Sequence, residues 1–333
     1  MRRIGPRHLF VLAICAIVTL ISQGWIGAET IYSKELAVKR SELHFAILNN
    51  TPPEGKTWSE IGARSTNIRI ASIFAAEFLR KSIGADVAQA YFLLDSAFLF
   101  VALVALYAYL RFWFSPQWAF GGLLGMALLL PLTYFLHYFH PWDRPGLLAW
   151  IILLHLVRAF RLLPLLVALP ASILIKYDTL VMPALYLIAG LRTERKWSAA
   201  VGAVLLGAAG LATYSLLCRY FPNSGPSDPT FSIVGQTIKN AKDALESGLR
   251  YPPLLADIPL ILLAMAGWRD SDQFLRSCVI FSLVPLAAWS TMSNLQEVRA
   301  HTPLFVLLLP AAIHGVRRLL NDATAELTPG AKT

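Results

Sequence analysis

Short stretches of the sequence place charged side chains between apolar runs, and their residue types indicate what chemistry they could do. In HYFHPWDRPG, which ends at Gly146, Asp143 has the chemistry of a general base or of an acceptor for a sugar hydroxyl. Asp143 is also a suitable N-cap for a helix that begins near Gly146, and capping is the favoured interpretation of this residue alone. His137 and His140 have the spacing of helical neighbours, but Pro141 interrupts that helix, so no metal site is predicted.

Two further stretches carry cations that suit a phosphate. In ILIKYDTLVMP, Lys176 and Asp178 lie in the gap between two apolar runs. In the simplest interpretation, the two side chains neutralise each other. In the functional interpretation, Lys176 holds a phosphate and Asp178 contacts a hydroxyl. In SNLQEVRAHTPLF, Arg299 suits bidentate capture of a phosphate, and a salt bridge with Glu297 is the alternative.

Asp95 differs from these residues because it lies inside an apolar run, YFLLDSAFLF. A carboxylate there is costly, so we expect it to face other helices or a wet cavity. Its simplest role is a hydrogen bond to a neighbouring helix.

The elements that position these residues follow from the composition. The chain of 333 residues is 56% hydrophobic and only 15% charged, which is typical of a membrane protein. A helix needs roughly 20 apolar residues to cross about 30 Å of hydrocarbon, and we count about ten such segments, which predicts an all-α polytopic bundle. The predicted spans are 8–27, 87–110, 118–138, 146–160, 162–175, 178–191, 198–218, 253–268, 276–292 and 303–318. The fifth and sixth are short, and they could equally form one helix that breaks near Lys176.

The first apolar segment has two interpretations. It fits a retained spanning helix, which we favour, and it also fits a cleavable signal peptide that ends near Ala28. The three cysteines, at positions 15, 218 and 278, lack metal-ligand spacing. The net charge of +9 does not indicate nucleic-acid binding, because much of the basic excess lies next to helix ends.

The basic residues of the short loops predict the orientation. With the N-terminus and the C-terminus in the cytoplasm, the cytoplasmic ends carry Arg2, Arg3, Arg7, Arg111, Arg158, Arg161, Arg192, Arg195, Lys196, Arg269, Arg276, Arg317 and Arg318. The short external loops carry only Arg144, Lys176 and Arg299. Asp143, Lys176 and Arg299 therefore belong to loops on one side of the membrane.

Two long segments, 28–86 and 219–252, are predicted to be external, each with an amphipathic helix in the interface. The first helix would place Ile70, Ile73, Phe74 and Phe78 on one face, and the second Ile238, Ala241, Leu245 and Leu249. The chain is thus predicted to form a single membrane domain, 1–320, followed by a polar disordered tail, 321–333.

The sequence resembles the polytopic GT-C-type glycosyltransferases and the related polysaccharide-assembly membrane proteins of bacteria, over roughly residues 9–318. The resemblance begins in the first external loop of this chain, in the stretch KRSELHFAILNNTPPEGKTW. This loop continues through RSTNIRIASIFAAEFLRKSIG into AQAYFLLDSAFLF. FHPWDRPGLLAW, ILIKYDTLVMPALYL and LQEVRAHTPL follow in the same order, on the same side. In one respect the chain departs from the family, which usually has an acidic motif early in this loop, because there is no aspartate between Met1 and Gly84. Glu29 is the carboxylate nearest the expected place.

The resemblance implies transfer of a sugar from a polyprenyl-phosphate carrier to an acceptor on the external face of the inner membrane. Glu29 or Asp143 would serve as the base. The substrate-binding candidates are His140, Trp142, Lys176, Asp178, Glu297 and Arg299, with Trp142 stacking on a sugar ring. No resident cofactor is predicted and the need for a divalent metal stays open. The alternatives are a non-catalytic or polymerising polysaccharide-assembly protein, and a secondary transporter that uses the break at Lys176 and Asp178.

Overall fold

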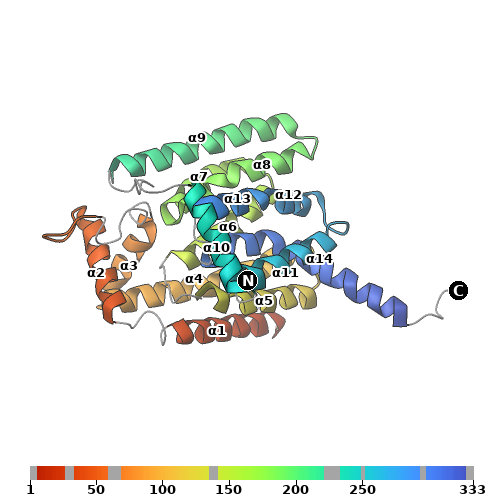
Figure 1. Cartoon of the computed structure of the whole chain (residues 1–333), viewed down its shortest axis with the longest axis horizontal. Coiled ribbons are helices and arrows are strands. Elements are labelled where there is room, and N and C mark those ends of the chain that lie inside the picture. The colour runs from red at the N-terminus through yellow and green to blue at the C-terminus, as the bar shows by residue number, and fades with distance from the viewer. Residues whose placement is uncertain are drawn as a thin grey trace. The chain divides into compact units, whose positions relative to one another are not determined.

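The computed structural model describes residues 6–26, 34–58, 69–134, 142–220, 233–248, 252–292 and 298–327. Within these ranges it contains helices and no strand, so the all-α prediction is confirmed (Figure 1). The chain divides into two compact units, and the helices α4 and α8 pass from one unit to the other. Unit 1 consists of Met1–Leu106, Leu136–Tyr186 and Trp197–Phe231, and unit 2 of Tyr107–Phe135, Leu187–Lys196 and Ser232–Thr333. Whether residues 1–320 form the predicted single membrane domain depends on how the two units combine, and this stays a prediction.

Unit 1 is built around the packing of α6 against α7. Its elements are α1 (Pro6–Ile26), α2 (Lys34–Asn49), α3 (Ile70–Ile83), most of α4 (Val87–Leu110), α6 (Asp143–Arg158), α7 (Leu162–Ile175), η3 (Tyr177–Val181), the first half of α8 (Met182–Leu191) and nearly all of α9 (Lys196–Tyr220). The helix α3 contacts both α2 and α7. Large buried side chains such as Trp150, Leu154 and Ile173 fill the space between these helices.

Unit 2 is built around the pair α11 and α14, which lie side by side (Figure 1). Its elements are α5 (Pro116–Leu129), η2 (Pro131–Tyr134), α10 (Ile233–Ser247), α11 (Pro252–Ala266), α12 (Gln273–Phe281), α13 (Leu283–Met292), η5 (Val298–His301) and α14 (Thr302–Leu327). The backbones of α11 and α14 approach closely because Gly267 and Gly315 have no side chains. A Cβ atom at Gly315 would collide with the carbonyl oxygen of Leu263.

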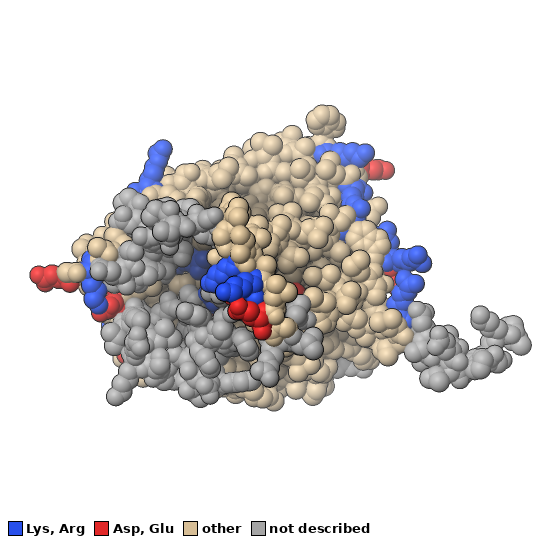
Figure 2. All heavy atoms as spheres, viewed as in Figure 1, with Lys and Arg blue, Asp and Glu red and all other residues tan. Residues whose placement is uncertain are grey.

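Several helices have the length and composition of membrane spans. Among the described residues, four are long and apolar enough to cross a membrane, namely Val87–Leu110, Pro116–Thr133, Lys196–Tyr220 and Val298–Asn321. Shorter apolar helices lie at or near five of the other six predicted spans, and α6 covers most of the sixth, 146–160. Ten crossings and the orientation stay predictions. Large apolar side chains are exposed on these helices, for example Leu20 at 71% and Val204 at 71%, as expected for surfaces that face lipid. In the view of Figure 2, uncharged side chains make up most of the described surface.

The structure shows whether the predicted spans 162–175 and 178–191 are one helix or two. The helix α7 ends at Ile175, Lys176 has extended backbone angles (φ −159°, ψ 117°), and a 3-10 turn leads into α8. The region from 162 to 191 is therefore two helices with a break at Lys176.

The predicted amphipathic helices and the tail can be compared with the structure, and the interfacial position of the two helices stays a prediction. In α3, Ile73 is buried whereas Phe74 and Phe78 are exposed. In α10 the apolar residues Ile238 and Leu245 are exposed, and the buried residue is Asn240, which donates to the carbonyl of Ser290 on α13 at 2.8 Å. The helix α14 continues to Leu327 and so includes the first residues of the segment predicted as a polar tail, whose disorder stays a prediction.

Candidate functional site

The break after α7 is stabilised by two buried hydroxyl groups. Ser172 donates from Oγ to Thr179 Oγ1 at 2.9 Å, and Thr179 Oγ1 lies 3.1 Å from the carbonyl oxygen of Lys176. The amide of Lys176 donates to the carbonyl of Ser172 at 2.8 Å, which closes the last turn of α7. These contacts satisfy backbone groups that the helix end would otherwise leave unpaired in an apolar environment.

The side chain of Lys176 lies between two carboxylates. Its Nζ is 3.3 Å from Asp143 Oδ1, on α6, and 3.3 Å from Asp178 Oδ2, on η3. The indole N–H of Trp150 donates to the other oxygen of Asp178 at 3.3 Å. The side chains of Lys176 and Asp143 are only 9% and 10% exposed, so this is a largely buried cluster in which one ammonium faces two carboxylates.

Asp143 does not cap a helix in the predicted way. The helix α6 begins at Asp143 itself, its N-cap is Trp142, and the cap makes no side-chain hydrogen bond. The amide of Gly146 donates to the carbonyl of Trp142 at 2.8 Å, which sets the first turn earlier than expected. Pro145 fits this first turn because the amides there need no helical partner. The prediction of a cap is therefore wrong, and the carboxylate of Asp143 is directed to Lys176.

Gly146 lets α6 approach the stem of Lys176. A Cβ atom at this position would lie 3.3 Å from Cδ of Lys176. Any larger residue would therefore push on the side chain that carries the ammonium group.

A second cation, Arg69, lies against aromatic rings at the same place. Its guanidinium carbon is 4.9 Å from the ring centre of Trp142 and 5.2 Å from that of Tyr177. Trp142 is only 1% exposed. The indole thus packs against the protein's own cation and presents no open surface for the sugar stacking that the sequence suggested.

Asp95 joins the network from α4. Its Oδ2 accepts a hydrogen bond of 2.7 Å from Gln23 Nε2 on α1, which confirms the expected bond to a neighbouring helix. Its carboxylate also interacts electrostatically with Arg144, and both side chains are at most 2% exposed. Unit 1 therefore gathers three carboxylates, Asp95, Asp143 and Asp178, with three cations, Arg69, Arg144 and Lys176.

A further network links α2, α3 and α4, and sequence reasoning missed it. His44 Nε2 is 2.9 Å from Glu77 Oε2, and His44 Nδ1 is 2.9 Å from the hydroxyl of Tyr91. Glu77 also accepts from Arg80 Nε at 2.7 Å and pairs with Lys81 at 3.2 Å. Glu77, Arg80 and Lys81 have the spacing of neighbours on one helical face. An acidic residue followed three and four positions later by basic ones is the sequence pattern that could have predicted these ion pairs.

Unit 2 contains its own buried pair, which was also missed. Asp257 Oδ2, on α11, lies 2.6 Å from Nδ1 of His301, on η5, and both side chains are at most 5% exposed. The sequence marks His301 only as one polar residue of an external loop, and Asp257 follows a proline-rich helix start without any distinctive motif.

Three of the remaining predicted site residues, Glu29, His140 and Glu297, lie outside the described residues. Arg299 belongs to η5 of unit 2, where its carbonyl accepts from the hydroxyl of Thr302 at 2.7 Å. Of the predicted residues, the structure thus brings Trp142, Asp143, Lys176 and Asp178 together.

The described part of the chain contains no group of three or more His, Cys, Asp or Glu side chains arranged to hold a metal ion. Comparisons with models of known protein families, with curated proteins and with solved structures give no match.

Proposed function

We propose that the chain is a membrane glycosyltransferase-like protein that transfers a sugar from a polyprenyl-phosphate carrier to a hydroxyl acceptor at the external face of the membrane. The observation that carries this proposal is the buried ammonium of Lys176 between the carboxylates of Asp143 and Asp178. Burying charges in an apolar protein costs several kcal/mol per ion, so a cluster of this size favours a function over a purely structural role.

The cluster offers both kinds of group that this reaction needs. Lys176, Arg144 and Arg69 are cations close to one another in unit 1, and a phosphate diester or monoester would be stabilised by such groups. Asp143 can accept a proton from a hydroxyl once a phosphate has taken its place on Lys176. Without a bound substrate, the ion pairs keep the charges of the cluster neutralised.

The proposed step is a single displacement. The acceptor oxygen forms a bond to the anomeric carbon of the sugar, and the bond from that carbon to the phosphate oxygen breaks. The acceptor proton passes to Asp143 and then to solvent, and polyprenyl phosphate leaves with its negative charge held by Lys176. No redox partner is required, because no atom changes its oxidation state overall.

The test uses the full chain reconstituted in liposomes with a polyprenyl-phosphate-linked hexose that is radiolabelled in the sugar. A glycolipid extract of the envelope supplies acceptors, and the measured quantity is label transferred out of the carrier. We expect transfer by the wild-type chain and a loss of about a hundredfold or more in Asp143→Asn. Absence of transfer by the wild-type chain, or equal transfer by Asp143→Asn, contradicts the proposal.

A matched control separates this effect from a general loss of charge. Lys56 pairs with Glu42 at 2.7 Å in the same unit, but its side chain is 44% exposed. We expect Lys56→Ala to transfer as well as the wild-type chain, whereas Lys176→Ala should not. Because Lys176→Ala leaves two buried carboxylates facing each other, Lys176→Arg serves as the variant that keeps the charge and the fold.

One observation favours transport as a second candidate. The helical break at Lys176, with a buried cation between two carboxylates, is also the arrangement expected of a coupling site in a discontinuous helix. Uptake of a solute into the same liposomes that requires an ion gradient and disappears in Lys176→Ala and Asp178→Ala would support transport. A glycan phenotype without transfer in vitro would instead support a polymerising or assembly role.

A further inference from the structure

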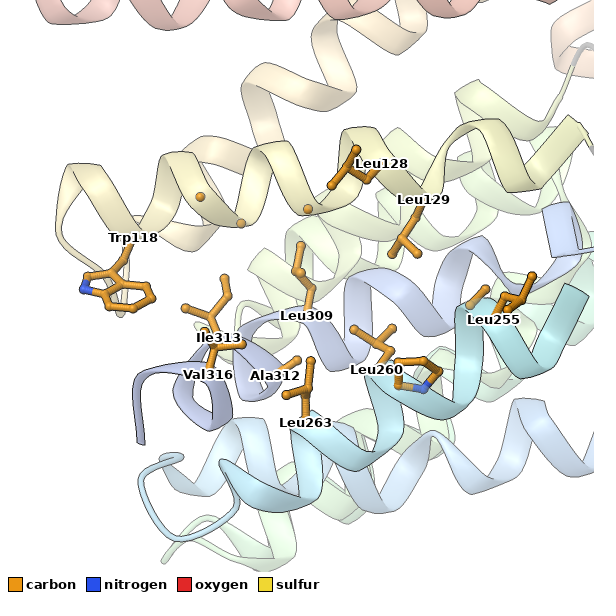
Figure 3. Close-up of a pocket in the computed structure, with 15 residues that line it drawn as sticks. Trp118, Leu128, Leu129, Leu255, Leu260, Leu263, Leu309, Ala312, Ile313 and Val316 are labelled. Carbon is orange, nitrogen blue, oxygen red and sulfur yellow. The ribbon is translucent and has the colours of Figure 1, made fainter. Parts of the chain in front are cut away.

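Unit 2 has an apolar groove that the proposed reaction does not use. It has a volume of about 400 Å³ and lies between α5 and α11, with α14 as its floor (Figure 3). Figure 3 shows Trp118 at one end and Leu255 with Leu129 at the other, and Ile313 and Val316 near the Trp118 end. All of its lining residues are apolar or glycine.

The glycines of the groove determine its shape. Gly122 faces α14, where an added Cβ atom would lie 2.5 Å from Ile313. Gly121 and Gly125 face open space, because an added Cβ atom would meet nothing within 4 Å. The floor is held in place by the close approach of α11 and α14 at Gly267 and Gly315, so the groove cannot close by moving these two helices together.

The length of the groove indicates what occupies it. Along α5 it runs from Trp118 to Leu129, which is about 17 Å at the rise of an α-helix. The hydrocarbon core of a bilayer is about 30 Å thick, so the groove is roughly one leaflet deep. A spanning helix of a second copy would need contact through both leaflets, whereas one acyl chain of a phospholipid occupies a single leaflet.

An arginine lies at the Trp118 end of the groove. The guanidinium carbon of Arg317 lies 5.6 Å from the ring centre of Trp118. Cations beside an interfacial tryptophan attract anionic headgroups.

We infer that this groove binds one acyl chain of an anionic phospholipid, with the lipid phosphate at Arg317. By the predicted topology this is the cytoplasmic leaflet. The charge of the groove's end selects the headgroup, and the glycines of α5 make room for the chain.

The test is native mass spectrometry of the purified full chain in detergent with added phosphatidylglycerol or phosphatidylcholine. We expect one tightly retained phosphatidylglycerol per chain, and a loss of about tenfold or more in its affinity for Gly125→Leu, whose side chain fills the groove. Arg317→Gln should reduce the preference for phosphatidylglycerol over phosphatidylcholine while both lipids still bind.

The matched control is Gly207→Leu on α9, because a Cβ atom there also meets nothing within 4 Å. This variant should bind phosphatidylglycerol as the wild-type chain does. Unchanged binding in both Gly125→Leu and Arg317→Gln overturns the inference. So does a wild-type dimer without bound lipid that Gly125→Leu dissociates, because a second copy would then occupy the groove.

Discussion

His44 illustrates how a single residue of this protein responds to its surroundings. Burial is the main reason that its pKa lies below the ordinary value of about 6.5, and the attraction of Glu77 offsets burial only in part. The neutral imidazole donates from Nε2 to Glu77, which as a carboxylate can only accept, and its Nδ1 then accepts from the hydroxyl of Tyr91. Arg80, together with His44 and Lys81, holds the pKa of Glu77 well below its usual range.

A pH dependence of stability follows from these two shifts. Both groups bind protons less readily in the folded chain than in the unfolded one, so folding is favoured fully above about pH 6.5 and less as the pH falls. The thermal midpoint in detergent should therefore fall between about pH 7.5 and pH 5, and His44→Gln should flatten this slope. His8→Gln, at an exposed position of the same unit, is the control and should keep the slope. An unaltered slope in His44→Gln would assign the pH response to other groups.

At the scale of elements, the contact of α11 with α14 depends on glycine. A Cβ atom at Gly315 meets the carbonyl oxygen of Leu263, which is backbone and cannot rotate away as a side chain could. We expect Gly315→Ala to separate the two helices and to lower the free energy of unfolding by about 1–3 kcal/mol, the usual cost of overpacking. The measurement is denaturant unfolding in detergent.

Gly207→Ala gives the comparison for this prediction. Its added methyl group meets open space, so the better helix propensity of alanine should leave stability equal or raise it by up to about 1 kcal/mol. Equal effects of Gly315→Ala and Gly207→Ala would show that the close approach of the helices contributes little.

For the whole molecule, the testable property is its orientation in the membrane. The basic short loops predict that the segment with Glu54 is external and that the loop with Glu194 is cytoplasmic. Both glutamates are exposed, and the chain's cysteines at positions 15, 218 and 278 can be replaced by alanine. In intact cells a membrane-impermeant maleimide should label Glu54→Cys, and it should label Glu194→Cys only after permeabilisation. The reverse pattern would invert the topology, and with it the side on which the proposed reaction takes place.

The sequence alone was sufficient for the positions of most apolar helices, but it did not predict α2, and the predicted span 276–292 is two helices, α12 and α13. Apolar run length is a local property, and for α4 and α7 the predicted limits, 87–110 and 162–175, are those of the structure. The charged stretches around Asp143 and Lys176 were also found from the sequence, because ionisable residues are rare in apolar segments. The predicted start of α6 was a few residues too late, because the helix begins at Asp143 and includes Pro145 in its first turn. Proline lacks an amide proton, but the amides of a first turn need no helical hydrogen-bond partner.

The tertiary structure was needed to establish which of these charges meet. Lys176 is far from Asp143 in sequence, and Asp95 is far from Gln23, yet each pair is in contact. In a membrane protein both the lipid-facing and the bundle-facing sides of a helix are apolar, so the hydrophobic period that orients a helix in a soluble protein carries little information. Helix contacts are set instead by close packing and by the pairing of polar groups, and these depend on the whole fold. The same reason explains why Arg69, His44 and Asp257, which have no distinctive sequence context, were recognised only from their neighbours.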